Sequence, residues 1–215
     1  MENASYKTLA GEGCESFIIK KSRFIGYGCP CQTEEEALSF LARIRAKHKD
    51  ATHNCYAYII GQNAGIMRYS DDGEPGGTAG MPIIEVMKNR SVVNAAVVVT
   101  RYFGGVLLGA GGLVRAYAQG SKTALDAAKV VVMRKSTRWL VEVSYSCWQR
   151  LEHYLKTASC LLISTQFETS VVATLMTRAD GEEALLADIT RLSDGQAEFL
   201  RESELYYPWP EEEAE

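Results

Sequence analysis

Residues 97–117 read Val97-Val-Val-Thr-Arg-Tyr-Phe-Gly-Gly-Val-Leu-Leu-Gly-Ala-Gly-Gly-Leu-Val-Arg-Ala-Tyr117. The segment begins as an apolar run typical of a buried strand and passes directly into a loop with five glycines. Glycine has no Cβ and adopts positive φ without steric cost, so such a loop permits tight turns and leaves backbone amides accessible. The sequence therefore predicts a connection that lets another group approach the backbone closely.

A helix is predicted after this loop, because apolar residues recur at helical spacing from Leu113 to Ala128. The positive end of that helix would lie near Arg101 and Arg115, an arrangement suited to phosphate. The candidate phosphate or nucleic-acid site comprises Arg101, Tyr102, Phe103, Gly104, Gly105, Gly109, Gly111, Gly112 and Arg115. The alternative is a strand-to-helix connection whose glycines only allow close packing.

The common nucleotide-binding motifs do not fit this loop. No Gly-Lys-Ser or Gly-Lys-Thr follows the glycines, and Gly109-Ala-Gly-Gly-Leu-Val114 breaks the dinucleotide fingerprint at its last glycine. The acidic residue that the fingerprint requires about twenty residues later is replaced by valines at 130–132. The sequence thus argues against a nucleotide-hydrolysing or Rossmann enzyme, and no cofactor is predicted.

A second candidate site lies upstream, where Asp71, Asp72 and Glu74 occur among turn-forming residues and His53 stands at the entrance of a predicted strand. These side chains offer oxygen ligands for a divalent cation or a group for acid–base catalysis. Equally, aspartates cap turns and helices without any chemistry. The spacing does not match a calcium loop, and Cys29-Pro-Cys31 has no second cysteine pair, so no metal site is predicted.

Length and charge indicate two domains. The chain has 215 residues, and 47% of them are hydrophobic, enough for a substantial core. Residues 1–136 contain 17 Lys and Arg against 12 Asp and Glu, a net charge of +5, whereas residues 137–215 contain 6 against 15, a net charge of −9. A mildly basic domain beside an acidic one is compatible with binding of structured RNA or a ribosomal particle, or simply with two solvated surfaces.

The expected location is the cytoplasm. The sequence contains no apolar run long enough for a membrane helix and no N-terminal signal pattern, so no membrane association is predicted. The six cysteines, at 14, 29, 31, 55, 147 and 160, are accordingly expected to be reduced thiols.

The first half of the chain predicts an α+β domain. Strands are expected at 15–19, 23–28, 55–60, 65–69 and 92–100, with a short closing strand at 130–133. Helices are expected after a capping box at Thr33 and Glu36, over 78–89, and from Leu113 onward. The polar run Arg134-Lys-Ser-Thr-Arg138 is taken as the boundary between the domains.

The second half predicts the order strand, helix, strand, strand, helix, strand over residues 139–205, which is the ferredoxin-like βαββαβ arrangement. The domains are therefore expected at 1–136 and 137–209, followed by an acidic tail at 210–215. Because many functions use this fold, the second domain predicts architecture and no activity.

Four separated motifs resemble the YigZ/IMPACT family. They are Lys21-Ser-Arg-Phe-Ile-Gly26; Ala51-Thr-His-Asn-Cys-Tyr-Ala-Tyr58; Ser70-Asp-Asp-Gly-Glu-Pro75 with Gly77-Thr-Ala-Gly80 and Pro82; and Val99-Thr-Arg-Tyr-Phe-Gly-Gly105 continuing to Leu113-Val-Arg-Ala-Tyr117. The resemblance covers residues from about 15 to 130, and the remainder fits the C-terminal domain of the bacterial members by pattern alone.

This resemblance implies an N-terminal α/β sandwich like the second domain of a small-subunit ribosomal protein, shared with one domain of elongation factor G. It also implies a ferredoxin-like C-terminal domain similar to the last domain of that factor. Eukaryotic relatives are linked to control of translation. The sequence thus predicts a protein that binds RNA or a ribosomal particle through the glycine-rich loop. The alternatives are an enzyme acting on a phosphorylated metabolite or nucleotide, with or without a metal, and a surface that binds another protein.

Overall fold

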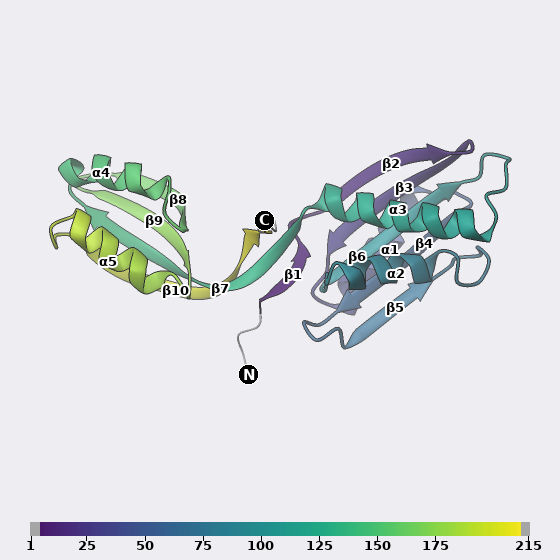
Figure 1. Ribbon diagram of the computed structural model, residues 1–215, viewed down its shortest axis with the longest axis horizontal. Coiled ribbons are helices and arrows are strands. Elements are labelled where there is room, and N and C mark those ends of the chain that lie inside the picture. The colour runs from purple at the N-terminus through teal and green to yellow at the C-terminus, as the bar shows by residue number, and fades with distance from the viewer. Residues whose placement is uncertain (1–4, 212–215) are drawn as a thin grey trace. The chain divides into compact units, whose positions relative to one another are not determined.

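The computed structural model describes residues 5–211 and divides the chain into two compact units (Figure 1). The N-terminal unit contains residues 6–132 together with 208–211. The C-terminal unit contains residues 133–207 with Ser5. Each unit is built from an antiparallel β-sheet and helices, so the chain is an α+β protein. None of the helices in the described residues combines the length and the apolar character needed to cross a bilayer.

The sheet of the N-terminal unit has five strands. They are β2 (Gly13–Ile19), β3 (Ser22–Pro30), β4 (His53–Ile60), β5 (Ile66–Ser70) and β6 (Ala95–Tyr102), in the order β2-β3-β6-β4-β5. Every neighbouring pair is antiparallel. β6 occupies the centre and is apolar on both faces, with Ala95 to Val99 all buried, because both faces of the sheet are covered.

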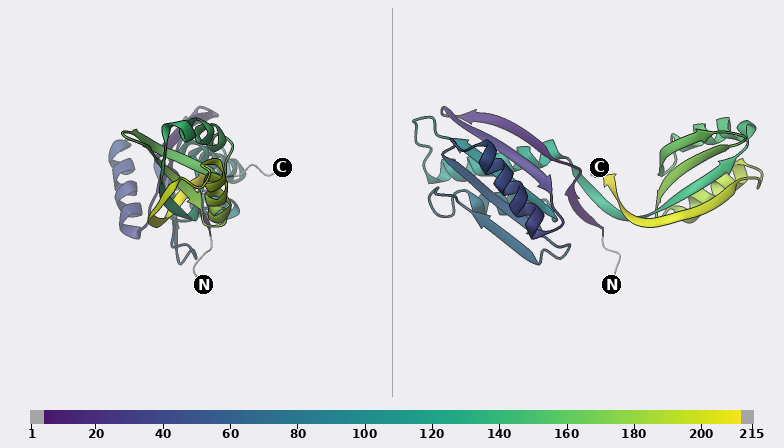
Figure 2. Two further views of the ribbon diagram at one scale, coloured as in Figure 1. Left: turned by 90° about the vertical axis from the view of Figure 1, so that its left-hand side faces the viewer. Right: turned by 180° about the vertical axis from the view of Figure 1, so that it is seen from behind.

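Two helices cover one face of this sheet and one helix covers the other. The helices α2 (Gly80–Asn89) and α3 (Ala110–Ala128) bury one cluster that includes Phe24, Val97 and Leu125. On the opposite face, α1 (Glu34–Lys47) buries Phe40 and neighbouring residues against the sheet (Figure 2). The result is a three-layer unit with the sheet in the middle.

Glycines set the short distance between α3 and the sheet. A Cβ added at Gly26 would lie 2.2 Å from the carbonyl oxygen of Gly120, and one added at Gly120 would lie 2.8 Å from a methyl carbon of Val99. Both distances are shorter than side chains tolerate, so these positions require glycine for close packing. This packing fixes α3 over the sheet and brings its N-terminus to the end where β6 finishes.

Several element ends differ from the sequence prediction. β6 begins at Ala95 and not at Val92, because Ser91 and Asn94 have positive φ and interrupt an extended strand. α2 begins at Gly80 and not at Thr78, because Asp71 accepts hydrogen bonds from the backbone N–H groups of Ala79 and Gly80.

The predicted capping box at the start of α1 is present in altered form. The Thr33 hydroxyl accepts from the backbone N–H of Glu36 at 3.2 Å, as predicted. The Glu36 carboxylate accepts from the backbone N–H of Gln32 at 2.6 Å, one residue earlier than the motif specifies.

The second half of the chain has the predicted element order. It contains β7 (Val130–Val143), α4 (Tyr145–Leu155), β8 (Cys160–Phe167), β9 (Val171–Arg178), α5 (Glu182–Leu192) and β10 (Glu198–Pro210). β9 lies between β7 and β8 and is antiparallel to both, while β10 and the short β1 (Tyr6–Leu9) also pair with β7. The apolar sides of α4 and α5 cover this sheet, with Trp148, Leu151 and Ile189 buried.

The polar run 134–138 is not a loop. It lies inside β7, where Ser136 and Thr137 are buried and pair with Arg178 and Thr177 of β9. The buried hydroxyls are tolerated there because each has a partner: Ser136 donates to the backbone carbonyl of Arg134 and Thr137 donates to the Glu182 carboxylate. Of the predicted acidic tail, Pro210 ends β10 and Glu211 forms an ion pair with Lys7 at 2.6 Å, while residues 212–215 lie outside the described residues.

Candidate functional site

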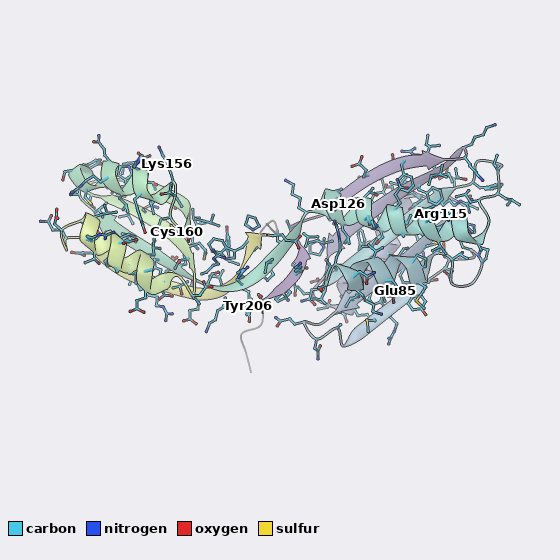
Figure 3. All side chains as sticks on the ribbon, viewed as in Figure 1. Glu85, Arg115, Asp126, Lys156, Cys160 and Tyr206 are labelled. Carbon is cyan, nitrogen blue, oxygen red and sulfur yellow. The ribbon has the colours of Figure 1, made fainter. Side chains whose placement is uncertain are left out.

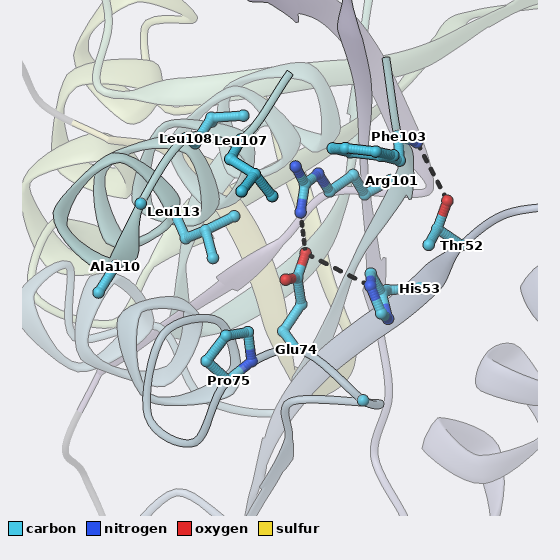
Figure 4. Close-up of a pocket in the computed structure, with 12 residues that line it drawn as sticks. Thr52, His53, Glu74, Pro75, Arg101, Phe103, Leu107, Leu108, Ala110 and Leu113 are labelled. Atoms are coloured by element: carbon cyan, nitrogen blue, oxygen red, sulfur yellow. Dashed lines mark hydrogen bonds and ion pairs between the residues drawn. The ribbon is translucent and has the colours of Figure 1, made fainter. Parts of the chain in front are cut away.

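A pocket of about 400 Å³ lies at the end of the N-terminal sheet where β6 finishes (Figure 4). Four separate segments form its walls. These are residues 52–53 at the start of β4, residues 73–75 of the turn before α2, Arg101 and Phe103 at the end of β6, and residues 107–113 around the start of α3. The antiparallel register brings two of them together, because Arg101 of β6 pairs directly with His53 of β4.

Arg101 and Glu74 form a buried ion pair at the base of the pocket. Arg101 Nη1 donates to Glu74 Oε1 at 2.6 Å, and the two side chains are only 5% and 3% exposed. The hydroxyl of Tyr117, from α3, donates to the same oxygen at 2.7 Å. The guanidinium also lies over the Phe24 ring, 5.5 Å from its centroid. The charge of Arg101 is thus neutralised within the protein and is not a free phosphate receptor.

Burial governs the ionisation of the groups behind this pair. Burial raises the pKa of Tyr117 far above its usual range, and the neighbouring Cys55 and Glu74 add to the effect. Burial also raises the pKa of Cys55 to about 12, so this thiol stays protonated at neutral pH. Its Sγ donates to the backbone carbonyl of Asp71 at 3.0 Å, which is a structural contact.

His53 has a fixed tautomer. Its Nδ1 lies 2.8 Å from the backbone carbonyl oxygen of Asp72, and because a carbonyl only accepts, Nδ1 carries the proton. In the neutral ring, Nε2 is then left with a lone pair, 3.8 Å from Glu74 Oε1. A histidine held in this way has the geometry of a general base or a hydrogen-bond acceptor.

The other two carboxylates of the candidate turn are structural. Asp71 accepts hydrogen bonds from the backbone N–H groups of Gly77, Ala79 and Gly80 at 2.8–3.0 Å. Burial alone would raise the pKa of Asp71, but these hydrogen bonds outweigh it and lower the pKa. Asp72 accepts from the backbone N–H of Asn54 and pairs with Arg45.

Of the acidic residues in the candidate turn, Glu74 alone lines the pocket. Within residues 5–211, no group of three or more histidine, cysteine, aspartate or glutamate side chains is arranged to hold a metal ion.

The glycines of the loop have different roles. Gly109 precedes α3 with φ of 72° and lines the pocket. In the first turn of α3, the backbone N–H groups of Ala110, Gly111 and Gly112 donate to no described residue, and the first helical bond is that of Leu113 to Gly109. Gly111 and Gly112 do not themselves line the pocket.

Gly104 and Gly105 allow the backbone conformation of the loop. A Cβ at Gly104 would lie 2.1 Å from the backbone carbon of Lys21, so this residue permits close approach of the β2–β3 turn. Gly105 has φ of 80°, a conformation that favours glycine. Neither residue lines the pocket.

The sequence predicts that Tyr102 and Arg115 belong to the site, but neither residue lines the pocket. Neighbouring strand residues face opposite sides of a sheet, so Arg101 and Tyr102 point apart. Tyr102 contacts His48 on the α1 side. Arg115 is exposed on α3 and forms no ion pair with a described residue (Figure 3). Phe103 lines the pocket together with Arg101, and its side chain is 45% exposed.

Sequence reasoning missed the apolar walls and the second partner of Glu74. Pro75, Leu107, Leu108 and Leu113 line the pocket, although none was a candidate. Tyr117 is fully buried, and its hydroxyl donates to Glu74. Its place in the helical spacing, among apolar residues of α3, was the signal that could have indicated burial.

The α1 side of this end of the sheet yields a testable pH effect. His48 accepts from the Tyr27 hydroxyl at Nε2 (2.6 Å), and its Nδ1 donates to the Tyr102 hydroxyl (2.8 Å), which donates to Asp50. Burial lowers the pKa of His48, aided by the charges of Lys47 and Arg23 and opposed by Asp50.

A lowered histidine pKa means that the unfolded chain binds the proton more tightly. The stabilising contribution of neutral His48 is therefore fully present above the unfolded pKa of about 6.5 and is lost as pH falls below it. We expect His48→Gln, which keeps one acceptor and one donor, to reduce this pH dependence. The free energy of unfolding is measured in urea at a series of pH values, with hydrogen exchange of the β6 amides as the readout. An unchanged pH profile in the variant would show that His48 is not responsible.

Comparison with known proteins places both units among described families. Residues 20–125 match the model described as the Impact N-terminal domain, and residues 141–196 match a domain of unknown function, DUF1949. The chain is 37% identical over 203 residues to the IMPACT family member YvyE of Bacillus subtilis, covering 94% of this chain and 93% of that protein. It is 33% identical over 186 residues to the IMPACT family member YigZ of Escherichia coli, covering 85% and 90%.

Two further matches differ in extent. Protein IMPACT of Mus musculus is 35% identical over 95 residues, which covers 42% of this chain and 29% of the mouse protein. A solved structure described as the crystal structure of a hypothetical protein is 30% identical, covers 94% of this chain and 99% of its own, and superposes with a TM-score of 0.59. The bacterial matches therefore extend over both units, whereas the mouse match is confined to a part.

Proposed function

Because this chain belongs to the IMPACT family, with the two-domain arrangement of its bacterial members YigZ and YvyE, we propose that its N-terminal unit binds RNA and takes part in the regulation of translation. The proposed contact surface is the end of the sheet that carries the pocket. The observation that carries the proposal is the gathering at that end of cations and helix amides that have no partner among residues 5–211.

The cations come from two sides of the pocket. Lys20 and Lys21 form the turn between β2 and β3, and Gly104 of the pocket loop lies against the backbone of Lys21. Arg23 lies beside this turn but pairs with Tyr102, so its side chain faces the α1 side of the sheet and is not part of this surface. Arg115 lies one turn into α3. The side chains of Lys20, Lys21 and Arg115 are exposed, and none of the three forms an ion pair with a described residue. RNA phosphates would interact with such a surface through direct, salt-sensitive contacts.

The β2–β3 turn holds its lysines in an unfavourable backbone conformation. Lys20 and Lys21 have φ of 44° and 67°, and the strands pair from Ile19 to Ser22, which is the geometry of a two-residue hairpin turn. Such turns favour Asn-Gly, because both central residues need positive φ. Two lysines at these positions cost stability and present two adjacent charges at a rigid point, which supports a binding role.

An exposed aromatic ring lies at the pocket. The Phe103 ring is 45% exposed, and its centroid lies 5.4 Å from the Arg101 guanidinium carbon. Unpaired RNA bases stack on exposed aromatic side chains, and the stacking tolerates any base. The surface thus combines phosphate contacts with a stacking platform, which favours single-stranded or looped RNA.

The double variant Lys20→Asn with Lys21→Gly tests this function. It removes two cations while giving the turn its preferred sequence, so the fold is expected to be retained or stabilised. If both lysines contact phosphates, the slope of log affinity against log salt should fall in magnitude by about 1.4, or 0.7 for each contact with a single strand. Fluorescence anisotropy with a labelled mixed-sequence RNA over a salt series measures it.

A matched control removes two lysine charges outside the proposed contact surface. Lys122 lies two turns beyond Arg115 on α3, and Lys156 follows α4 in the C-terminal unit; both are exposed. The variant Lys122→Ala with Lys156→Ala should keep the wild-type slope. Equal slopes for all three proteins, or no measurable RNA binding by the wild type, would refute the proposed function. Arg101 is unsuitable for this test because its loss leaves Glu74 buried without its counter-ion.

The enzymatic alternative stays a prediction. His53 has the geometry of a general base in the pocket, but neither a cysteine nor a serine is among the described residues that line it.

A further inference from the structure

The carboxylate of Glu74 has one oxygen that no residue of the described chain satisfies. Oε1 accepts from Arg101 and from Tyr117, whereas Oε2 accepts from no described residue. Figure 4 draws this second oxygen on the side of the carboxylate that faces Leu113 and Pro75, away from His53. The side chain is 3% exposed. Since buried ionised acceptors in proteins are nearly always paired, a free oxygen at a pocket points to a hydrogen-bond donor on a ligand.

The space in front of this oxygen has apolar walls. The apolar side chains that line it are Pro75, Phe103, Leu107, Leu108 and Leu113. The volume of about 400 Å³ falls within the range of small-ligand sites. Apolar walls with two acceptors at the base, Glu74 Oε2 and the Nε2 lone pair of His53, suit a flat ring system that carries N–H donors on its edge.

The start of α3 offers hydrogen-bond donors to a ligand, whereas Glu74 offers an acceptor. Ala110 lines the pocket at the first position of a helix of 19 residues, and the N–H groups of Ala110, Gly111 and Gly112 donate to no acceptor in the described part of the chain. Such amides and the helix dipole favour an anion, most naturally a phosphate. A ligand that satisfies the whole pocket therefore has donors at one end, a flat apolar body and an anionic group at the other end.

We infer that the pocket holds a single unstacked nucleotide, with an N–H group of its base donating to Glu74 Oε2 and its phosphate accepting from the amides at the start of α3. This inference rests on the proposed function, because the nucleotide would be one that the bound RNA inserts from the surface around Phe103. Bases splayed out of single-stranded RNA are commonly read in this manner, by stacking and by hydrogen bonds to their edges.

The variant Ala110→Pro tests the phosphate contact. Proline is favoured at the first position of a helix, so the change removes one N–H from the pocket while the helix is retained. Titration of the full chain with the four nucleoside monophosphates, each at up to about 1 mM, should show binding of at least one by NMR or calorimetry. Ala110→Pro should weaken that binding about tenfold, as expected for one hydrogen bond to a charged group.

Further controls test the phosphate contact and the base contact separately. Ala110→Ser keeps the N–H and should bind as the wild type does. The matching nucleoside, which lacks the phosphate, should bind the wild type and Ala110→Pro equally. For the base end, methylation of the N–H donors of the tightest-binding base should abolish the contact with Glu74 Oε2 and weaken binding to every variant. The methylated position is the ring N–H of uracil, the ring N–H and amino group of guanine, or both amino hydrogens of adenine or cytosine.

Failure of this inference is distinguishable from failure of the proposed function. If no monophosphate binds, or if Ala110→Pro binds all of them as the wild type does, the pocket does not hold a nucleotide, even where RNA binding depends on Lys20 and Lys21. If a monophosphate binds as described while RNA does not, the pocket assignment stands and the RNA proposal fails. Binding of a free amino acid such as leucine in place of nucleotides would assign the donor to an ammonium group and overturn the inference.

Discussion

Replacement of Arg101 by alanine is expected to lower the free energy of unfolding of the N-terminal unit by about 3–5 kcal/mol, the usual cost of removing one partner from a buried ion pair. The Glu74 carboxylate would keep only the Tyr117 hydroxyl as a close donor, at 3% exposure. The burial of both partners decides the size of the effect, since an exposed ion pair contributes only about 0.2–1 kcal/mol. A loss within that lower range would contradict the description of the pair as buried.

A double-mutant cycle separates the ion pair from the packing of the arginine stem. Arg101→Met with Glu74→Gln removes both charges and keeps two side chains of similar length. We expect this double variant to lose less stability than the sum of the two single variants, because no buried charge remains unpaired. Additive losses would show that the two side chains act independently.

The measurement must report on the correct unit. Trp139 and Trp148 belong to the C-terminal unit, and Trp209 to the short 208–211 segment, so tryptophan fluorescence would follow mainly the wrong part of the chain. Hydrogen exchange of the β6 amides in a urea series follows the central strand of the N-terminal sheet directly. The same readout serves all stability variants of this unit.

Replacement of Phe24 by alanine is the second change with a large expected effect, again about 3–5 kcal/mol of unfolding free energy. The ring is fully buried. It stacks on Phe17 with centroids 5.5 Å apart, and it meets Tyr117 edge-on at the same distance. The Arg101 guanidinium lies above it. The substitution would leave a cavity directly beneath the ion pair that forms the base of the pocket.

Phe17 provides the matched control for Phe24. It belongs to the edge strand β2 and is only partly buried, so Phe17→Ala removes the same side chain from a less enclosed place. We expect a clearly smaller loss, because the cost of such a change grows with the cavity that remains. Equal losses for the two variants would mean that Phe24 has no special role under the site.

Several features could be predicted from the sequence because they depend on neighbours along the chain. The alternating and helical patterns gave the element order of both halves, and Thr33 gave the start of α1. The residue types at His53, Glu74, Arg101, Phe103 and Gly109 indicated a site, and the structure brings all five to one pocket. The period of two in a strand also predicts that the side chains of Arg101 and Tyr102, at the end of β6, face opposite sides of the sheet.

The sequence by itself determined the family, the α+β class and a minority of the residues that line the pocket, because motifs, periodicity and glycine spacing are local properties of the chain. Only the tertiary structure decided that Arg101 is neutralised by Glu74, that Tyr117 supports this pair, that Asp71 and Asp72 hold the turn, and that Leu113 and Pro75 wall the pocket. The physical reason is that charge pairing and burial depend on which distant segments meet. His53, Glu74, Arg101 and Tyr117 come from four separate segments of the chain, and the register of β4 and β6 together with the close packing of α3 brings them within contact.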